Sequence, residues 1–266
     1  MRRRGFALLA VLWTLAAVTA AVGGTLAALK DGPRASRNRI LLARGRWAAE
    51  ACLAIADARW EAGRWADSAT IDLGRATRCA WHAEDPAARL NLNTMDHAVL
   101  QRFFISTGMP SNQASALSDS VVARRRLAPF ASPEQLRDVA DVPDAVLAEF
   151  TVDGPGTVNA NAAAPQVLAA LPGLGPEAIE RIASRRASGR PLTSLDALVA
   201  ALSPIGRAAL LAEYAVLARL LVFGSAQLTI EAAGWVDVES TAPRATIEVA
   251  VVLLPSRLAV IRRRLL

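Results

Sequence analysis

Apolar residues gather first in one long block near the start of the chain. The stretch 6–29 contains 24 residues and no charged side chain, and Lys30 and Asp31 follow it. At about 1.5 Å per residue, a helix of this length spans about 36 Å, more than a hydrocarbon core of about 30 Å. The pattern therefore predicts a transmembrane helix over 6–29. The three arginines at positions 2–4 favour a cytoplasmic N-terminus, which places the rest of the chain outside.

A secretory signal peptide is the alternative for this block. Such peptides have an apolar region of about 7 to 15 residues followed by a cleavage site of small residues. Small residues around Ala20 and Ala27 keep this cleavage open, but the block is longer than a signal peptide needs. We therefore expect a retained membrane anchor.

Helical spacing continues beyond the block, from Asn38 to Trp60. The apolar positions that recur there are Ile40, Leu41, Ala48, Cys52, Ile55 and Ala56, with Arg and Glu between them. This pattern predicts an amphipathic helix, and we expect the chain to bend at Gly32-Pro33 where it joins the membrane helix. We expect the tryptophans at 47, 60 and 65 to pack this helix against a sheet, because large aromatic side chains usually serve burial.

Alternating apolar and polar residues predict strands in two regions. Ile71 and Leu73, then Cys79 and Trp81, indicate two short strands around Gly74. Near the C-terminus, the segments 228–231, 235–238 and 246–251 alternate in the same way, with turns expected at Gly234 and at 241–243. These segments predict an antiparallel meander on which the amphipathic helix can lie. The arginines at 262–264 are expected to form a solvated strand end.

The middle of the chain contains an internal repeat. Leu-Asn-Leu-Asn at 90–93 matches Val-Asn-Ala-Asn at 158–161 with an offset of 68, and Pro-Phe-Ala-Ser at 129–132 matches Pro-Leu-Thr-Ser at 191–194 with an offset of 62. Each unit predicts a short extended segment, a helix capped by Asn or Thr, a turn, a second helix, and a third helix begun at Ser132 or Ser194. The repeats are expected near 89–140 and 157–203.

The formal charge of +6 suggests a nucleic-acid ligand until the charges are placed along the chain. Six of the 30 basic residues lie at 2–4 and 262–264, so the rest of the chain carries 24 basic and 24 acidic residues. A neutral body lacks the basic footprint that phosphate backbones require. We therefore do not expect nucleic acid as a partner.

Candidate chemistry along the chain is sparse. No nucleophile with a base, paired carboxylate motif, phosphate loop or metal-binding histidine pair is present, which argues against an enzyme. Cys52 and Cys79, with only His82 and His97 to help, lack zinc-ligand spacing. Outside the cytoplasm the two cysteines become candidates for a disulfide, since that compartment can be oxidising.

The first residues carry a more specific signal. The junction Gly5-Phe6 follows a short basic leader and precedes Ala-Leu-Leu-Ala-Val-Leu-Trp at 7–13, which resembles a type IV prepilin leader. The resemblance implies cleavage after Gly5 by a prepilin peptidase, methylation of the new Phe6 amine, and a retained helix. Ordinary pilins carry Glu at the fifth mature position, where this chain has Ala10.

A second motif lies in the second repeat. The segment 171–179 resembles a helix-hairpin-helix motif through Pro172, Gly173 and Gly175. In DNA-binding examples, the amides of such a turn hold a phosphate at a helix N-terminus. Glu177 would oppose a phosphate there, so we favour protein contact over DNA contact.

The leader, the missing glutamate, the repeats and the hairpin together resemble the minor pseudopilin K of type II secretion, also called general secretion pathway protein K. The resemblance implies an α+β pseudopilin fold with a long N-terminal helix, an antiparallel sheet and a large helical insertion with two hairpin-like repeats. The expected parts are a leader (1–5), a transmembrane helix (6–29), a helix with the first strands (30–88), an insertion (89–219) and C-terminal strands (220–266).

The same resemblance implies a place for the protein in the cell. It predicts a single-pass inner-membrane protein with a periplasmic domain, which helps start a pseudopilus and occupies its tip. The implied partners are other minor pseudopilins, the prepilin peptidase, and secreted proteins or the outer-membrane secretin. Calcium is known in the family, but the chain has no Asp-rich ligand run, so we assign no metal ligands and expect no other cofactor.

Two rival functions remain. A membrane-anchored DNA receptor of an uptake system could use the hairpin repeats, although the neutral body argues against it. An ordinary minor pilin would share the leader but is not expected to carry the two helical repeats.

Overall fold

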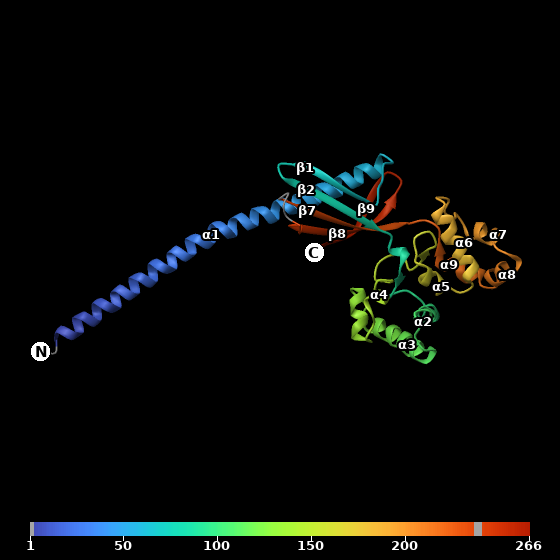
Figure 1. Ribbon diagram of the computed structural model, residues 1–266, viewed down its shortest axis with the longest axis horizontal. Helices are drawn as coiled ribbons and strands as arrows, with labels where there is room; N and C mark the ends of the chain where they lie inside the picture. The colour runs from blue at the N-terminus through green and yellow to red at the C-terminus, as the bar shows by residue number, and fades with distance from the viewer. Residues whose placement is uncertain (1–2, 237–240) are drawn as a thin grey trace.

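One long helix dominates the computed structural model, which describes residues 3–236 and 241–266. Helix α1 runs from Arg3 to Glu61 as one element, and helical structure continues through Gly32 and Pro33. Its N-terminal half projects far from the rest of the protein (Figure 1). The side chains of residues 3–10 and 21–34 lie outside what the structure describes.

Five antiparallel strands form the main sheet, in the order β1-β2-β7-β8-β9. The strands are β1 (Ser68–Gly74), β2 (Thr77–Glu84), β7 (Gln227–Trp235), β8 (Ala245–Leu254) and β9 (Arg257–Leu265). The two strands expected around Gly74 are β1 and β2, joined by a tight turn. Strands β2 and β7 are neighbours in space although the whole helical insertion separates them in sequence.

The C-terminal strands differ from the expected meander at Gly234. Gly234 is not a turn, since β7 continues through it to Trp235. Of the strand expected at 235–238, Val236 lies beyond the end of β7, and residues 237 and 238 are outside the described residues. The arginines at 262–264 occupy the last part of β9, as expected of a strand end, and Arg263 and Arg264 are exposed. Each of these arginines has a carboxylate neighbour, in Asp153, Glu50 or Glu248.

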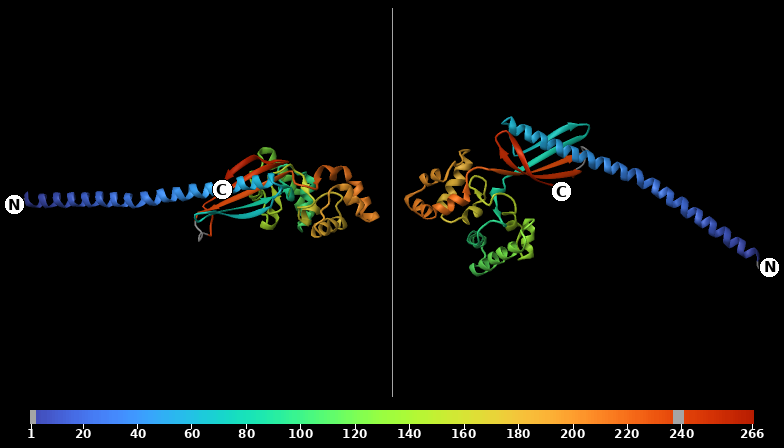
Figure 2. Two further views of the ribbon diagram at one scale, coloured as in Figure 1. Left: turned by 90° about the horizontal axis from the view of Figure 1, so that it is seen from above. Right: turned by 180° about the vertical axis from the view of Figure 1, so that it is seen from behind.

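The C-terminal half of α1 lies across one face of this sheet (Figure 2). The core between them contains Ala48, Ala49, Cys52 and Ala56 of α1 and the side chains of β2, β7 and β8 that face it, among them Cys79, Trp81, Ile230 and Val249. A disulfide joins Cys52 to Cys79, with their Cα atoms 5.9 Å apart, and both residues are fully buried. The helix is therefore fixed to the sheet by apolar contact and by a covalent bond.

Two glycines allow α1 to approach the sheet closely. A Cβ atom on Gly234 would lie 2.0 Å from the Gly45 carbonyl oxygen and 2.9 Å from the Ala49 nitrogen. A Cβ atom on Gly45 would lie 2.5 Å from the Cβ of Arg244. Gly234 thus serves helix-to-sheet contact rather than chain reversal, which is the physical reason that the expected turn is absent.

The insertion begins after β2 and contains two consecutive units. The first consists of η1 (Pro86–Ala88), β3 (Leu90–Asn91), α2 (His97–Ser106), α3 (Ser111–Leu127), η2 (Pro133–Asp138), α4 (Asp144–Leu147) and β4 (Phe150–Thr151). The second consists of β5 (Val158–Asn159), α5 (Pro165–Ala169), α6 (Pro176–Ala187), α7 (Leu195–Ala200), α8 (Pro204–Ala212), α9 (Tyr214–Leu220) and β6 (Leu221–Val222). In each unit the first short strand pairs in parallel with the last, β3 with β4 and β5 with β6.

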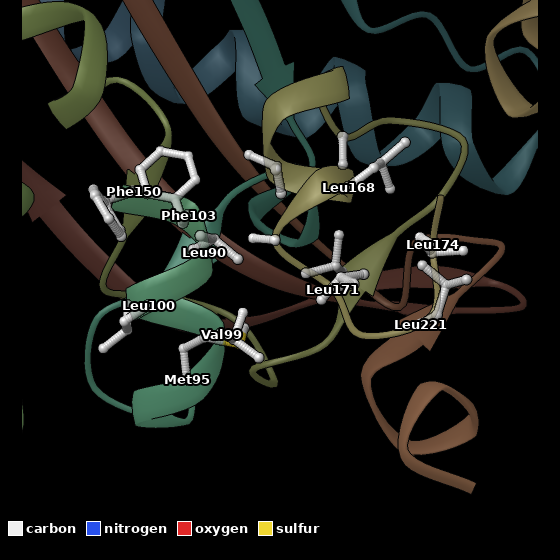
Figure 3. Close-up of a cluster of buried hydrophobic side chains, with 14 of the residues drawn as sticks. Leu90, Met95, Val99, Leu100, Phe103, Phe150, Leu168, Leu171, Leu174 and Leu221 are labelled. Atoms are coloured by element: carbon white, nitrogen blue, oxygen red, sulfur yellow. The ribbon is translucent and has the colours of Figure 1, made fainter. Parts of the chain in front are cut away.

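The two units share one apolar core (Figure 3). Phe103 of α2 and Phe150 of β4 contact edge to face with their ring centroids 5.0 Å apart, and both side chains are almost completely buried. Leu168 and Leu171 of the second unit belong to the same cluster. The repeat therefore folds as one double unit, placed beyond the sheet at the end away from the N-terminus (Figure 1).

Helix starts in the two units follow the expected caps only in part. The Ser194 hydroxyl accepts a hydrogen bond from the Ala197 N–H at the start of α7, as a serine cap should. Ser132 precedes a 3-10 helix and makes no side-chain cap bond, and α2 begins after Asp96, also without one. The asparagines of the repeat have another role, described below.

Candidate assembly surface

The exposed part of α1 is the most unusual surface of the protein. Five large apolar side chains between residues 11 and 18 are 58 to 71% exposed, namely Val11, Leu12, Trp13, Leu15 and Val18. Among the residues searched, which exclude parts of the expected membrane segment, no helix meets the length and apolarity that a membrane span requires. Gly5, Phe6 and Ala10 lie in α1, and their side chains are outside the described set.

Beyond the expected membrane segment, the side chains of α1 remain exposed until the helix reaches the sheet. From residue 35 to residue 44 every side chain except Leu41 is exposed, and Ile40 is 58% exposed. Trp47 is 74% exposed, so the expectation that it packs against the sheet is wrong. It lies on the side of α1 opposite Cys52, because five residues along a helix correspond to about 140° of rotation. Ile40 is likewise not part of the buried face.

The tryptophans at 60 and 65 behave as expected. Both are partly buried, and their rings contact each other edge to face at 5.5 Å between centroids. The Trp60 Nε1–H donates to the Leu254 carbonyl oxygen at 2.8 Å, which ties the end of α1 to β8. The three tryptophans therefore divide into two that hold the fold and one that faces outward.

Two of the three hairpin residues of the second unit, Pro172 and Gly173, pack within the unit itself. Gly173 has a φ of +76°, a left-handed conformation that favours glycine, and a Cβ atom there would lie 2.9 Å from the Cβ of Glu213. Pro172 is buried, whereas Gly175 is the exposed N-cap residue of α6. The turn thus packs one side against the α8–α9 region, which closes that side to a ligand.

Glu177, in the first turn of α6, is used within the protein. Its carboxylate accepts hydrogen bonds from the Ser203 backbone N–H and from the Ser203 hydroxyl, both at 2.7 Å. These two bonds hold the pKa of Glu177 below its usual value. The negative charge beside the α6 N-terminus therefore stays in place at neutral pH, which opposes the binding of a phosphate there.

We expect stability to depend on pH through Glu177. A carboxyl group whose pKa is lower in the folded state contributes stability above its unfolded pKa, and this contribution is lost as the pH falls through the folded pKa. The free energy of unfolding of the wild type should therefore fall more steeply with decreasing pH below pH 4.5, which is the usual pKa of Glu. Glu177→Gln should be less stable at pH 7 and should lose less stability on acidification. Urea unfolding at pH 7 and pH 3.5 measures both; equal pH dependence would contradict the prediction.

Two asparagine side chains, one in each unit, hold distant backbone segments together by hydrogen bonds that the sequence motifs did not predict. We call each of them a brace. The Asn93 side chain donates to the Phe130 carbonyl oxygen at 3.0 Å and accepts from the Phe130 N–H at 2.7 Å. Asn161 makes the same two bonds to Leu192, at 2.7 and 3.2 Å. The asparagines of the repeat thus join the first loop of each unit to its third helical segment.

An arginine completes each brace. The Arg125 guanidinium donates to the carbonyl oxygens of Leu92 and Met95, and burial is the main cause that lowers its pKa. Arg186 donates to the carbonyl oxygen of Ala163 at 2.6 Å in the second unit. These basic residues serve the fold, so they are not available as a nucleic-acid footprint. Their offset of 61 residues, close to that of the tail match, is the sequence signal that could have identified them.

A charge cluster joins the insertion to the sheet. Arg262 of β9 donates to Asp153, which follows β4, at 2.6 Å and to Glu248 of β8 at 3.0 Å. Burial opposes the charged guanidinium, but the bonds and charges of the two carboxylates outweigh it and raise the pKa of Arg262. A cleft of about 450 Å³ lies beside this cluster, between the open sheet face and η2.

The two histidines lie in different elements of the fold. His82 lies in β2 and has Glu84 as its neighbour, 3.4 Å away, whereas His97 begins α2. Within residues 3–236 and 241–266, as far as side chains are described, no group of three His, Cys, Asp or Glu residues could hold a metal ion. The surface that stands out is the bare, apolar α1.

Comparison with known proteins agrees with this picture at the level of fold. No protein-family profile and no curated protein sequence matches the chain. The structure is similar to a chain in the crystal structure of the GspK-GspI-GspJ complex from the enterotoxigenic Escherichia coli Type 2 Secretion System, with a TM-score of 0.56. The match covers 89% of this chain and 98% of that chain at 14% sequence identity. The protein therefore has the mixed helix-and-sheet fold of a type II secretion pseudopilin similar to GspK.

Proposed function

We propose that this protein is a non-enzymatic minor pseudopilin of a type II secretion system. In this proposal residues 6–29 anchor it in the inner membrane and the remainder of the chain lies in the periplasm. The observation that carries the proposal is the combination of a GspK-like fold with a projecting helix whose apolar side chains are exposed. Exposed apolar side chains of this kind are unfavourable on a single chain in water, whereas a membrane and neighbouring helices can cover them.

The beginning of the chain supports a place at the tip. The resemblance to pilins implies that a glutamate at the fifth mature position pairs with the N-terminal amine of a neighbouring subunit, and a carboxylate without a partner is costly inside a membrane. This chain has Ala10 at that position. A subunit with no neighbour ahead of it needs no carboxylate there, so we propose that this protein occupies the tip and helps start assembly.

The partners follow from the same likeness. The similar solved structure is a complex of GspK with GspI and GspJ. We propose that this chain binds the corresponding minor pseudopilins of its own system, and that the prepilin peptidase processes it. Contact with secreted proteins or the secretin would use the insertion, which lies at the end of the molecule opposite the N-terminus (Figure 2).

We interpret the insertion as two helix-hairpin-helix-like units that pack against protein. The supporting observations are the cover of Gly173 by the α8–α9 region, the carboxylate of Glu177 beside the α6 N-terminus, and the use of Arg125 and Arg186 as internal braces. A DNA-binding role would leave these groups free for phosphates. No observation favours the DNA-uptake alternative.

Processing at Gly5-Phe6 tests the proposal. The full chain is expressed with and without the prepilin peptidase of its own organism, and its intact mass and N-terminal peptide are measured. We expect an N-terminus at methylated Phe6 only when the peptidase is present. Gly5→Leu should remain uncut and serves as the control. An unprocessed wild-type chain with active peptidase, or a cut near Ala27, would contradict the proposed class.

A further inference from the structure

The largely exposed section of α1 between residues 35 and 47 has a heptad pattern. Ser36, Ile40, Ala43 and Trp47 follow one another at spacings of four, three and four residues, as the seam positions of a coiled coil do. All four are exposed, Trp47 to 74%. Because this spacing places them on one stripe of the helix, they form a narrow seam that a second helix can cover. We call it the α1 seam.

Arginines occupy both borders of the α1 seam. Arg37 and Arg44 are seven residues apart on one border, and Arg39 and Arg46 are seven residues apart on the other. These are the positions flanking a coiled-coil seam, where charges choose the partner helix. All four arginines are exposed. Between Asp31 and Glu50 the sequence contains no acidic residue.

The protein itself neutralises little of this charge. Arg44 donates to the Arg75 carbonyl oxygen and to the Thr77 hydroxyl, neither of which carries a charge. Arg46 lies 3.9 Å from Glu50, which also pairs with Arg263. In the described part of the chain, Arg37 and Arg39 have no carboxylate partner. The borders of the α1 seam therefore keep most of their positive charge.

We propose that the α1 seam binds a helix of another subunit that carries acidic residues at its own flanking positions. This inference rests on the proposed function and specifies the chemistry of the partner at the exposed helix. A second copy of this chain would place arginines against arginines, which is unfavourable. The seam thus selects a different protein, with Trp47 as the large apolar anchor.

Anionic lipid is a poorer match for the same arginines. Counted from residue 29, the end of the proposed membrane segment, Arg37 lies about 12 Å along the helix and Arg46 about 25 Å. Electrostatic attraction to a surface decays over about 8 Å at physiological ionic strength. Arg44 and Arg46 are therefore beyond the reach of the headgroups but within reach of a parallel helix.

Binding to two designed peptides tests the proposal. The full chain is placed in nanodiscs of neutral lipid and titrated with two labelled 28-residue helical peptides that share one apolar heptad seam. One peptide carries Glu at all flanking positions and the other carries Lys. We expect the wild type to bind the Glu peptide about tenfold more tightly than the Lys peptide, with a preference that shrinks as salt is added.

A variant with reversed charges distinguishes selection of the partner by charge from misfolding of the chain. A chain with Arg37→Glu, Arg39→Glu, Arg44→Glu and Arg46→Glu should prefer the Lys peptide, a gain that a misfolded chain would not show. Trp47→Ala should weaken the binding of both peptides by about tenfold, because it removes the apolar anchor. Equal binding of the two peptides by the wild type, absence of binding, or an unchanged preference after reversal would overturn the proposal.

Two further measurements distinguish anionic lipid from a protein helix as the ligand of the α1 seam. They also distinguish failure of this inference from failure of the proposed function. If the reversal changes only the binding of the isolated chain to vesicles with one-third anionic lipid, and not the peptide preference, then lipid is the ligand and the proposal fails. If the chain is processed at Gly5 and copurifies with its own minor pseudopilins but shows no peptide preference, then only this inference fails. If processing and copurification are absent as well, the proposed function fails.

Discussion

Replacing Cys52 and Cys79 together by alanine should lower the free energy of unfolding of the sheet domain by about 3.5 kcal/mol. The two residues are 27 positions apart and are joined by a disulfide between α1 and β2. Closing a loop of this length restricts the unfolded chain by about that amount. The sulfurs are completely buried, so alanine leaves small cavities that add to the loss.

Thermal unfolding of the full chain in detergent measures this effect through tryptophan fluorescence. Trp60, Trp65 and Trp81 lie in or beside the sheet domain and report on it. We expect the midpoint to fall by about 10 °C in the double variant. The wild type with a reducing agent should approach the same midpoint, because breaking the bond removes the same constraint. Midpoints within about 2 °C of the oxidised wild type in both cases would show that the bond does not stabilise this domain.

Local periodicity accounts for most of the fold that could be predicted from the sequence. The apolar block, the helical spacing that follows it and the repeat at an offset of 68 each arise from neighbours along the chain, so one sequence suffices to find them. The parallel pairing of β3 with β4 and of β5 with β6 was not predicted. These strands are only two residues long, and their pairing partners lie some 60 residues away.

Errors arose where a residue serves a distant contact. Gly234 has the composition of a turn, yet its role is the close passage of α1 against β7, and no neighbour in sequence reports that passage. The strand end at 262–264 was expected, but its ion pairs were not, because Asp153 and Glu50 come from remote segments to pair with these arginines. Pairing across long sequence separations leaves no mark on local patterning.

Trp47 illustrates a different kind of error. Its aromatic ring suggested burial against the sheet, but the face of α1 that contacts the sheet consists mainly of small residues such as Ala48, Ala49 and Ala56. The seven-residue spacing of the arginines beside Trp47 was present in the sequence and indicated a second, outward face. The outward face of α1 was therefore readable from the heptad positions, but not from the hydrophobicity of single residues.

The close passage of α1 over the sheet leads to the second large effect. Gly234→Ala should lower the free energy of unfolding by about 3 kcal/mol, because the new methyl group would lie 2.0 Å from the Gly45 carbonyl oxygen. This neighbour is backbone, which cannot rotate away, so α1 must lift from β7. Small residues at 48, 49 and 56 would then lose their contact with the sheet.

Gly224→Ala is the matched control for this substitution. A Cβ atom at Gly224 would meet no atom within 4 Å, so alanine there should be neutral or slightly stabilising through the lower entropy of the unfolded chain. Urea unfolding compares the two variants, and hydrogen exchange of the amides at 45–56 reports on the docking of α1. We expect faster exchange there in Gly234→Ala alone. If both variants unfold at the wild-type urea concentration, the helix and sheet do not approach as closely as the structure indicates, and the α1 seam would lose its fixed orientation toward a partner.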